Sequence, residues 1–188
     1  MKDELMTIIA ENNNVVEISD KLMYNESLLK EIAEYSQSPG NSEKCGLSAN
    51  TKPYFDKKGD TIYLLGDYKG GESDNSSHVE IINDAIEKGL VKSASAINGK
   101  GLFLSLIANC SVNDLGFDIT SDSEIDEKRF LFNPDISSFL ITVDGENEEK
   151  FVDYIYNNGM EITLLGHVTR GELRMDELSF GYISDFKE

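Results

Sequence analysis

Hydrophobic and polar positions along the first third of the chain predict short helices separated by polar breaks. Apolar residues recur at helical spacing over 5–9, and Asn12–Asn14 interrupt the pattern. The next apolar run, 15–18, is short and favours a strand. An amphipathic helix then carries Leu28, Leu29, Ile32, Ala33 and Tyr35, and Ser38-Pro39-Gly40 is expected to end it.

A polar stretch divides the chain into two parts. Residues 36–52 contain few apolar side chains and many turn formers. We therefore expect an N-terminal appendage over 1–52, made of helix, strand, helix and linker, and a compact domain over 53–188.

Strands and helices interleave in the second part. Strands are expected at 61–65, 91–97, 115–119, 139–143 and 162–168, followed by a hairpin of 172–175 with 178–183. Helices are expected to follow a capping box at Ser77–Glu80 and to end at Gly89, to cover 102–110, and to carry Phe151–Ile155. The hairpin and the alternating strands predict an α+β fold with a mixed, largely antiparallel sheet and helices packed on one face.

Charge and composition exclude several classes of partner. The chain has 188 residues and a formal net charge of -18, which repels nucleic acid phosphates and anionic lipid headgroups. No apolar run approaches the roughly 20 residues of a membrane-spanning helix. Cys45 and Cys110 form neither a disulfide framework nor a metal motif, so we expect a cytoplasmic protein. From the charge and the short apolar runs, we expect that it binds neither nucleic acid nor membranes.

The side chains that could carry chemistry are few. His78 lies in the predicted capping box and is expected to face solvent, and His167 is expected to lie at the end of a strand. The acidic runs 122–127 and 144–149 match no calcium loop and are expected to begin helices. We therefore predict no catalytic residue and no metal site.

One glycine-rich turn has the chemistry of an anion site. Asn98, Gly99, Lys100 and Gly101 connect a predicted strand to a predicted helix, so backbone amides and one ammonium could meet a phosphate. The spacing matches neither a Walker A motif nor a dinucleotide-binding fingerprint. We predict weak phosphate binding at this turn.

The order of four blocks resembles a known family. The blocks are KKGDTIYLLG (57–66), IEKGLVKSASAINGKGLFLSLIANC (86–110), RFLFNPDISSFLITV (129–143) and LLGHVTRGELRM (164–175). They resemble the C-terminal domain of the aminoimidazole ribonucleotide synthetase superfamily, and most of all that of phosphoribosylformylglycinamidine synthase. The resemblance spans about residues 53–176 and implies the α+β fold.

The chain departs from that family at its polar positions. The family's A-H-D-V-S-D-G-G-L pattern falls on 94–102, so Ser95 and Ala96 replace a His-Asp pair. The family's S-E-S-Q-G-R stretch falls on 133–138, where glutamate, glutamine and arginine are all missing. Neither Ser95 nor Ala96 can supply an acid–base group at neutral pH. The resemblance therefore implies a retained fold with lost or relocated chemistry.

Three functions remain open on this basis. The chain resembles part of an ATP-dependent amidotransferase of purine biosynthesis, and we expect the isolated chain to be inactive. The alternatives are a degenerate scaffold or interaction domain, and a domain of a hydrogenase-maturation, selenophosphate or thiamine-phosphate relative. The resemblance implies ATP and magnesium for the parent enzyme, with no cofactor expected for this chain alone. The implied partners are an ATP-binding N-terminal domain and a glutaminase domain or subunit, or a second copy of the chain.

Overall fold

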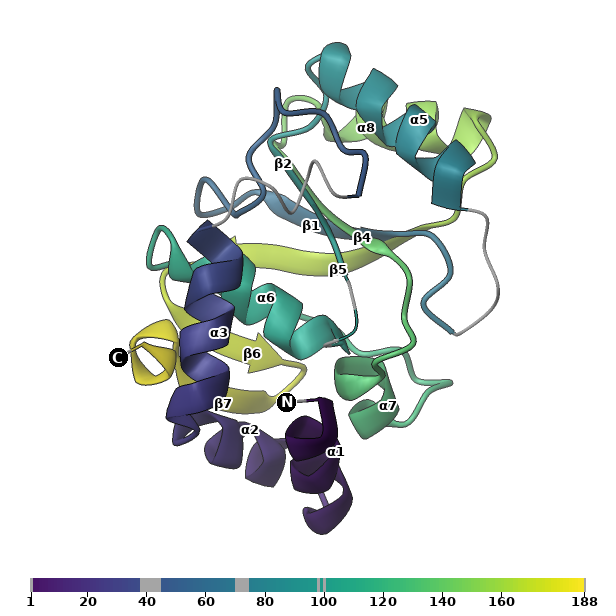
Figure 1. The fold of residues 1–188 in the computed structure, drawn as a ribbon. Coiled ribbons are helices and arrows are strands. Elements are labelled where there is room, and N and C mark those ends of the chain that lie inside the picture. Colours follow the sequence, from purple (N-terminus) through teal and green to yellow (C-terminus); the bar gives the residue numbers. More distant parts are fainter. Residues whose placement is uncertain (1, 38–44, 70–74, 98, 100, 188) are drawn as a thin grey trace.

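A twisted mixed sheet forms the centre of the molecule in a computed structural model that describes residues 2–37, 45–69, 75–97, 99 and 101–187 (Figure 1). The sheet is 7-stranded, in the order β2-β4-β1-β5-β3-β6-β7. Neighbouring strands pair antiparallel except β3 and β6, which are parallel. The strands are β1 (Thr61–Leu65), β2 (Ser93–Ala96), β3 (Gly116–Ile119), β4 (Phe139–Val143), β5 (Ile162–Thr169), β6 (Glu172–Met175) and β7 (Leu178–Tyr182). The predicted α+β class and the largely antiparallel sheet are confirmed.

Alternating side chains of β1 divide the hydrophobic core between the two faces of the sheet. Ile62 and Leu64 belong to a large cluster that includes helix α6 (Gly101–Ser111). Tyr63 and Leu65 belong to a smaller cluster with α5 (Asn75–Glu87) and α8 (Glu148–Asn157). The prediction placed helices on one face, and the structure adds this second, smaller layer over β2, β4 and β1 (Figure 1).

Residues 2–37 of the N-terminal segment fold into helices joined by short breaks. It forms α1 (Lys2–Glu11), α2 (Val15–Met23) and α3 (Glu26–Gln37), and α3 packs against α6 while α2 packs against β7. The predicted strand at 15–18 is therefore wrong. The Asn14 side chain accepts hydrogen bonds from the backbone N–H groups of Val16 (3.1 Å) and Glu17 (3.0 Å), which begins a helix at this point.

The apolar face of α2 explains why a helix forms there. Val15, Ile18 and Leu22 recur at helical spacing and are all buried in the large cluster. This period continues well beyond the short run that favoured a strand. The predicted end of α3 at Ser38-Pro39-Gly40 lies outside the described residues, and the boundary between residues 52 and 53 stays a prediction.

Helix ends in the second part follow the predicted signals with one exception. Gly89, at φ +71°, ends α5, and the Leu90 N–H donates to the Ala85 carbonyl oxygen at 3.1 Å. The helix begins at Asn75, however, so Ser77 lies inside its first turn and the predicted capping box is wrong.

Both acidic runs begin helices, as predicted. Asp126 accepts the backbone N–H groups of Lys128 and Arg129 and caps α7 (Glu127–Phe132). Asp144 accepts the backbone N–H of Asn147, just before α8, at 3.0 Å. Within the described ranges, no helix has the length and apolar character needed to cross a membrane.

Candidate functional site

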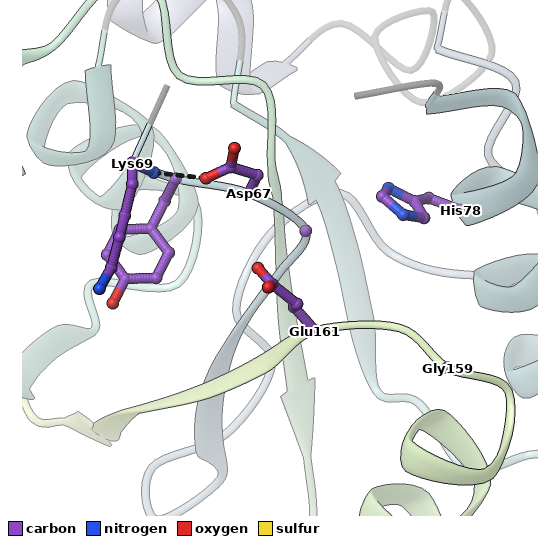
Figure 2. A pocket seen from close by; sticks show the side chains of 7 residues that line it. Asp67, Lys69, His78, Gly159 and Glu161 are labelled. Atoms are coloured by element: carbon purple, nitrogen blue, oxygen red, sulfur yellow. Dashed lines mark hydrogen bonds between the residues drawn. The ribbon is translucent and has the colours of Figure 1, made fainter. Parts of the chain in front are cut away.

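Polar residues gather around a pocket at the point where β1 leaves the sheet (Figure 2). The pocket has a volume of about 440 Å³ and is lined by Gly66, Asp67, Tyr68, Lys69, His78, Gly159 and Glu161. The Gly66 N–H donates to the Glu161 carbonyl oxygen at 3.1 Å, so the end of β1 is fixed beside the start of β5. Residues of the turn after β1, of α5 and of the α8–β5 connection therefore meet at one place.

Tyr68 and Lys69 anchor this turn to the segment before α7. The Tyr68 hydroxyl donates to Asp122 at 2.5 Å, and the Lys69 ammonium lies 3.0 Å from the Glu124 carboxylate. Burial, together with the hydrogen bond to Asp122, raises the pKa of Tyr68, while the same bond lowers the pKa of Asp122. The Lys69 ammonium is thus paired with Glu124 and lies within 3.5 Å of Asp122.

Among the described residues, the Asp67 and Glu161 carboxylates form no ion pair with a basic side chain. Asp67 accepts the backbone N–H of Lys69 at 2.8 Å (Figure 2). In the part of the chain that the structure describes, Glu161 makes no side-chain hydrogen bond or ion pair. No sequence pattern selects Asp67 or Glu161. Asp67 follows the buried strand β1 by two residues and Glu161 directly precedes β5, and those positions were the available signal.

His78 lies in the first turns of α5, where its side chain is half-buried. Its Nδ1 atom is shielded from solvent and has no hydrogen-bond partner among the described residues. A Cβ atom at Gly66 would lie 3.5 Å from this nitrogen, so the ring packs against the turn after β1. The prediction that His78 faces solvent is therefore wrong. His167 is exposed on β5 and does not line the pocket.

The remaining candidate nucleophiles and metal ligands do not form a centre. Burial raises the pKa of the Cys45 thiol, and it raises that of the fully buried Cys110 well above its ordinary value. Both thiols therefore lack the thiolate character of a reactive cysteine. Across the described ranges, no group of three histidine, cysteine, aspartate or glutamate side chains is arranged to hold a metal ion.

The glycine-rich turn is described only in part. Asn98 and Lys100 lie outside the described residues, whereas Gly99 is exposed at φ +62° and Gly101 begins α6 at φ +80°. A Cβ atom at Gly101 would lie 2.9 Å from the Leu131 carbonyl oxygen, so close packing against the end of α7 requires glycine at this position. Phosphate binding at the turn stays a prediction.

Ser95, on the histidine position of the family's His-Asp pair, is closed to solvent, whereas Ala96 beside it is half-buried. The Ser95 hydroxyl donates to the Asn109 side-chain oxygen at 3.2 Å, and the Asn109 amide lies 3.0 Å from the same hydroxyl. That amide also donates to the Ser105 carbonyl oxygen at 2.8 Å. Ser95 and Asn109 are buried, and their polar groups are satisfied inside the protein. The sequence analysis assigned Asn109 only to an apolar helix and missed this pair.

The third family block shows the same change. Ile136, at the position of a polar residue in the family pattern, is only 3% exposed and belongs to the large core cluster. Ser138 is also buried, and its hydroxyl has no partner among the described residues. Ile136 and Ser138 are therefore buried at positions where the family pattern is polar, whereas Asp135, directly before Ile136, is exposed.

Curated proteins similar in sequence to the chain include PurL subunits of phosphoribosylformylglycinamidine synthase. No protein-family model matches the chain. Over 150 residues the chain is 28% identical to subunit PurL of phosphoribosylformylglycinamidine synthase from Petrotoga mobilis, covering 76% of the chain and 20% of that subunit. The subunit from Carboxydothermus hydrogenoformans is 26% identical over 136 residues, which cover 61% of the chain and 19% of the subunit. The chain thus spans about a fifth of the length of these relatives.

Solved structures share the fold. PurL from Thermotoga maritima in complex with ATP has a TM-score of 0.60 and 11% identity, and the match covers 72% of this chain and 27% of that one. A PurLQS structure from the same organism has a TM-score of 0.60 and 12% identity, with 67% of this chain and 25% of that one covered. Sequence and fold therefore confirm the resemblance to the aminoimidazole ribonucleotide synthetase superfamily, and the chain is PurL-like.

Proposed function

We propose that this chain is the C-terminal-type domain of a phosphoribosylformylglycinamidine synthase-like amidotransferase of purine biosynthesis, and that it performs no chemistry by itself. The observation that carries the proposal is the buried Ser95–Asn109 pair. Ser95 falls on the histidine of the family's His-Asp pair, and the side chains of Ser95 and Asn109 bond within the protein. Among the described residues, no base contacts the Ser95 hydroxyl to activate it, and Ser95 is buried away from solvent.

The fold supports a role in packing. A domain that keeps the apolar positions of a family and loses its polar ones still presents the family's shape to a neighbouring domain. Ile136 is an example, because it adds apolar area to the core where the family pattern is polar. The domain thus retains the means to support a partner without taking part in the reaction.

ATP, magnesium and the partner domains belong to the proposed parent protein. One of the similar PurL structures contains ATP, and another is a PurLQS assembly. By analogy, we propose two partners for this chain, an ATP-binding N-terminal domain and a glutaminase domain or subunit. We also propose that the protein acts in the cytoplasm. Finding both in the full gene product, or encoded beside it, would support an amidotransferase over an unrelated scaffold.

A turnover assay tests the catalytic part of the proposal. The purified chain is supplied with formylglycinamide ribonucleotide, ammonia, magnesium and ATP, and the release of ADP and of the amidine product is measured. We expect both rates to equal those of a protein-free blank. The PurL subunit from Petrotoga mobilis, assayed in parallel, shows that the reagents are competent.

Two lysine variants identify the source of any turnover. Lys100→Ala removes the one ammonium of the glycine-rich turn, and Lys150→Ala removes an exposed ammonium on α8 as a matched control. Turnover that persists in Lys150→Ala but disappears in Lys100→Ala would show that the chain is an enzyme and would overturn the proposal. Equal turnover in the wild type and both variants at the level of the blank supports it.

A further inference from the structure

An apolar groove with an acidic rim lies between α2, α7 and the hairpin of β6 and β7. It has a volume of about 750 Å³ and is lined by Asn14, Val15, Val16, Glu17, Glu127, Asp176, Glu177 and Leu178. Val15 is buried in the large core cluster, and Val16 and Leu178 pack against that cluster while remaining half-exposed. The floor of the groove is therefore apolar and continuous with the core.

Four carboxylates surround this floor, and all four residues are exposed. They are Glu17 on α2, Glu127 on α7, and Asp176 and Glu177 in the hairpin turn. Among the described residues, Glu127 and Glu177 make no side-chain hydrogen bond or ion pair. A partner that fits an acidic rim around apolar side chains needs both an apolar group and positive charge.

The rim is held in place before any partner arrives. Asp176 adopts φ +54° in the tight turn between β6 and β7, and its carboxylate accepts the Ser121 hydroxyl at 2.7 Å. The Glu17 carboxylate accepts the backbone N–H of Asn13 at 2.9 Å. Because these carboxylates are already fixed, a ligand would lose little free energy in ordering them.

Among the described contacts, the lysines close to the rim form no ion pair with its carboxylates, so the rim keeps its negative charge. Lys128 follows Glu127 in the chain, and its ammonium donates to the Asn12 carbonyl oxygen at 2.7 Å. Lys21 lies one helical turn after Glu17, and the two form no ion pair among the described contacts. The Asn14 side chain already accepts the free N–H groups at the start of α2, so an anion is not needed there.

We propose that this groove docks a basic amphipathic peptide segment of a partner protein, with an apolar side chain on Val16 and Leu178 and flanking Lys or Arg side chains on the rim carboxylates. The charge of the whole chain, -18, favours a basic partner and disfavours a second copy of the same chain. The inference uses residues of α2, α7 and the β6–β7 hairpin, and it does not depend on the proposed function.

Three peptides test the inference on the full chain. The probes are acetyl-Lys-Arg-Leu-Leu-Arg-Lys-amide, the same peptide with Ser in place of both Leu, and acetyl-Glu-Glu-Leu-Leu-Glu-Glu-amide. Amide chemical shifts are followed during titration at low and at physiological salt. We expect the first peptide to shift residues 14–17, 127 and 176–178, the second to bind more weakly, and the third not to bind.

Charge-reversed variants test where the first peptide binds. Glu127→Lys with Glu177→Lys reverses two rim charges, and Glu80→Lys with Glu149→Lys reverses two exposed charges on α5 and α8 as the matched control. We expect affinity to fall about tenfold in the rim variant and to change little in the control. Val16→Ser reduces the apolar floor and should weaken binding without altering the charge.

Several outcomes would overturn the proposal. Equal affinity for the rim variant and the control variant would show attraction to the overall charge of the chain. Equal binding of the serine peptide would remove the role of the apolar floor. Concentration-dependent shifts of groove residues without any peptide, together with a dimer in sedimentation equilibrium, would assign the groove to a second copy of the chain.

Discussion

The Ser95–Asn109 pair and the pocket at the end of β1 hold polar side chains in opposite ways. Ser95 and Asn109 are buried, and each finds its hydrogen-bond partner inside the protein. Around the pocket, the Glu161 carboxylate has no partner among the described residues, and the Asp67 carboxylate accepts only a backbone N–H. Ser95 and Asn109 are thus closed to a ligand, whereas the Glu161 carboxylate at the pocket is accessible.

This difference predicts that the buried pair contributes to stability and that the side chains at the pocket do not. A buried polar group whose partner is removed loses a hydrogen bond that water cannot replace, whereas an exposed carboxylate is solvated with or without a partner. Substitutions at the closed pair should therefore act on folding. Substitutions around the pocket should leave the free energy of unfolding nearly unchanged and should act only on the binding of a ligand.

The largest loss of stability is expected from truncating buried apolar side chains on the two faces of the sheet. This loss is the reference for the polar variants. Leu64 lies in the large cluster and Ile82 in the small one, and both are fully buried. Leu64→Ala and Ile82→Ala should each lower the free energy of unfolding by about 2–5 kcal/mol. Urea denaturation midpoints measure this loss. A loss below that of the polar variants described next would contradict the placement of the two clusters.

Breaking the closed pair is expected to have the next largest effect. Asn109→Ala removes the partner of the Ser95 hydroxyl and of the Ser105 carbonyl oxygen, so unfolding free energy should fall by about 1–3 kcal/mol. Adding Ser95→Ala to this variant should cost less than Ser95→Ala alone, because the bond is already lost. Additive losses in the double-mutant cycle would show that the two side chains do not act together.

Asp60 provides a buried carboxyl whose second oxygen has no partner among the described residues. Burial raises the pKa of Asp60, so the folded protein favours its protonated form. The group's contribution to stability is complete below the unfolded pKa and is lost as the pH rises through the folded pKa. Asp60→Asn should therefore gain more stability at about pH 7 than at about pH 4. Asp153→Asn on α8 is the exposed control, and an equal pH dependence of both variants would contradict this reasoning.

Side chains around the pocket should have small effects on folding. Glu161→Gln and Ser77→Ala should change the free energy of unfolding by about 0.5 kcal/mol or less, since both residues are exposed and Ser77 is not the cap of α5. Urea midpoints measured beside those of Asn109→Ala provide the comparison. A loss from Glu161→Gln as large as that from Asn109→Ala would remove the distinction between the closed pair and the open pocket.

The weakest effect is expected in nucleotide binding. Backbone amides and the ammonium of Lys100 favour a phosphate at Asn98–Gly101, but the net charge of -18 opposes a polyphosphate. Titration with ADP, with and without magnesium, should shift amides of residues 98–103 with a dissociation constant of about 1 mM or weaker. These shifts should disappear in Lys100→Glu. Shifts centred on 122–127 would instead indicate metal binding by the acidic run.

Local sequence patterns determined most of the elements and some of their ends. Alternation predicted β3, the amphipathic pattern predicted α3, and the acidic runs predicted the starts of α7 and α8, because these signals depend on neighbours within a few residues. The order of the family blocks also indicated the fold. The short run at 15–18 misled the prediction, since Asn14 and the later Ile18 and Leu22 together favour a helix.

Tertiary structure alone decided which polar groups are open. Ser95 and Asn109 are separated by 14 positions and meet because β2 lies beside α6, so no local pattern links them. Glu17, Glu127 and Glu177 come from three distant segments and surround one groove only after folding. Short-range preferences in the sequence predicted where helices and strands form. The fold decided which polar groups are buried or hydrogen-bonded, because hydrogen bonding and burial depend on contacts between segments far apart in the chain.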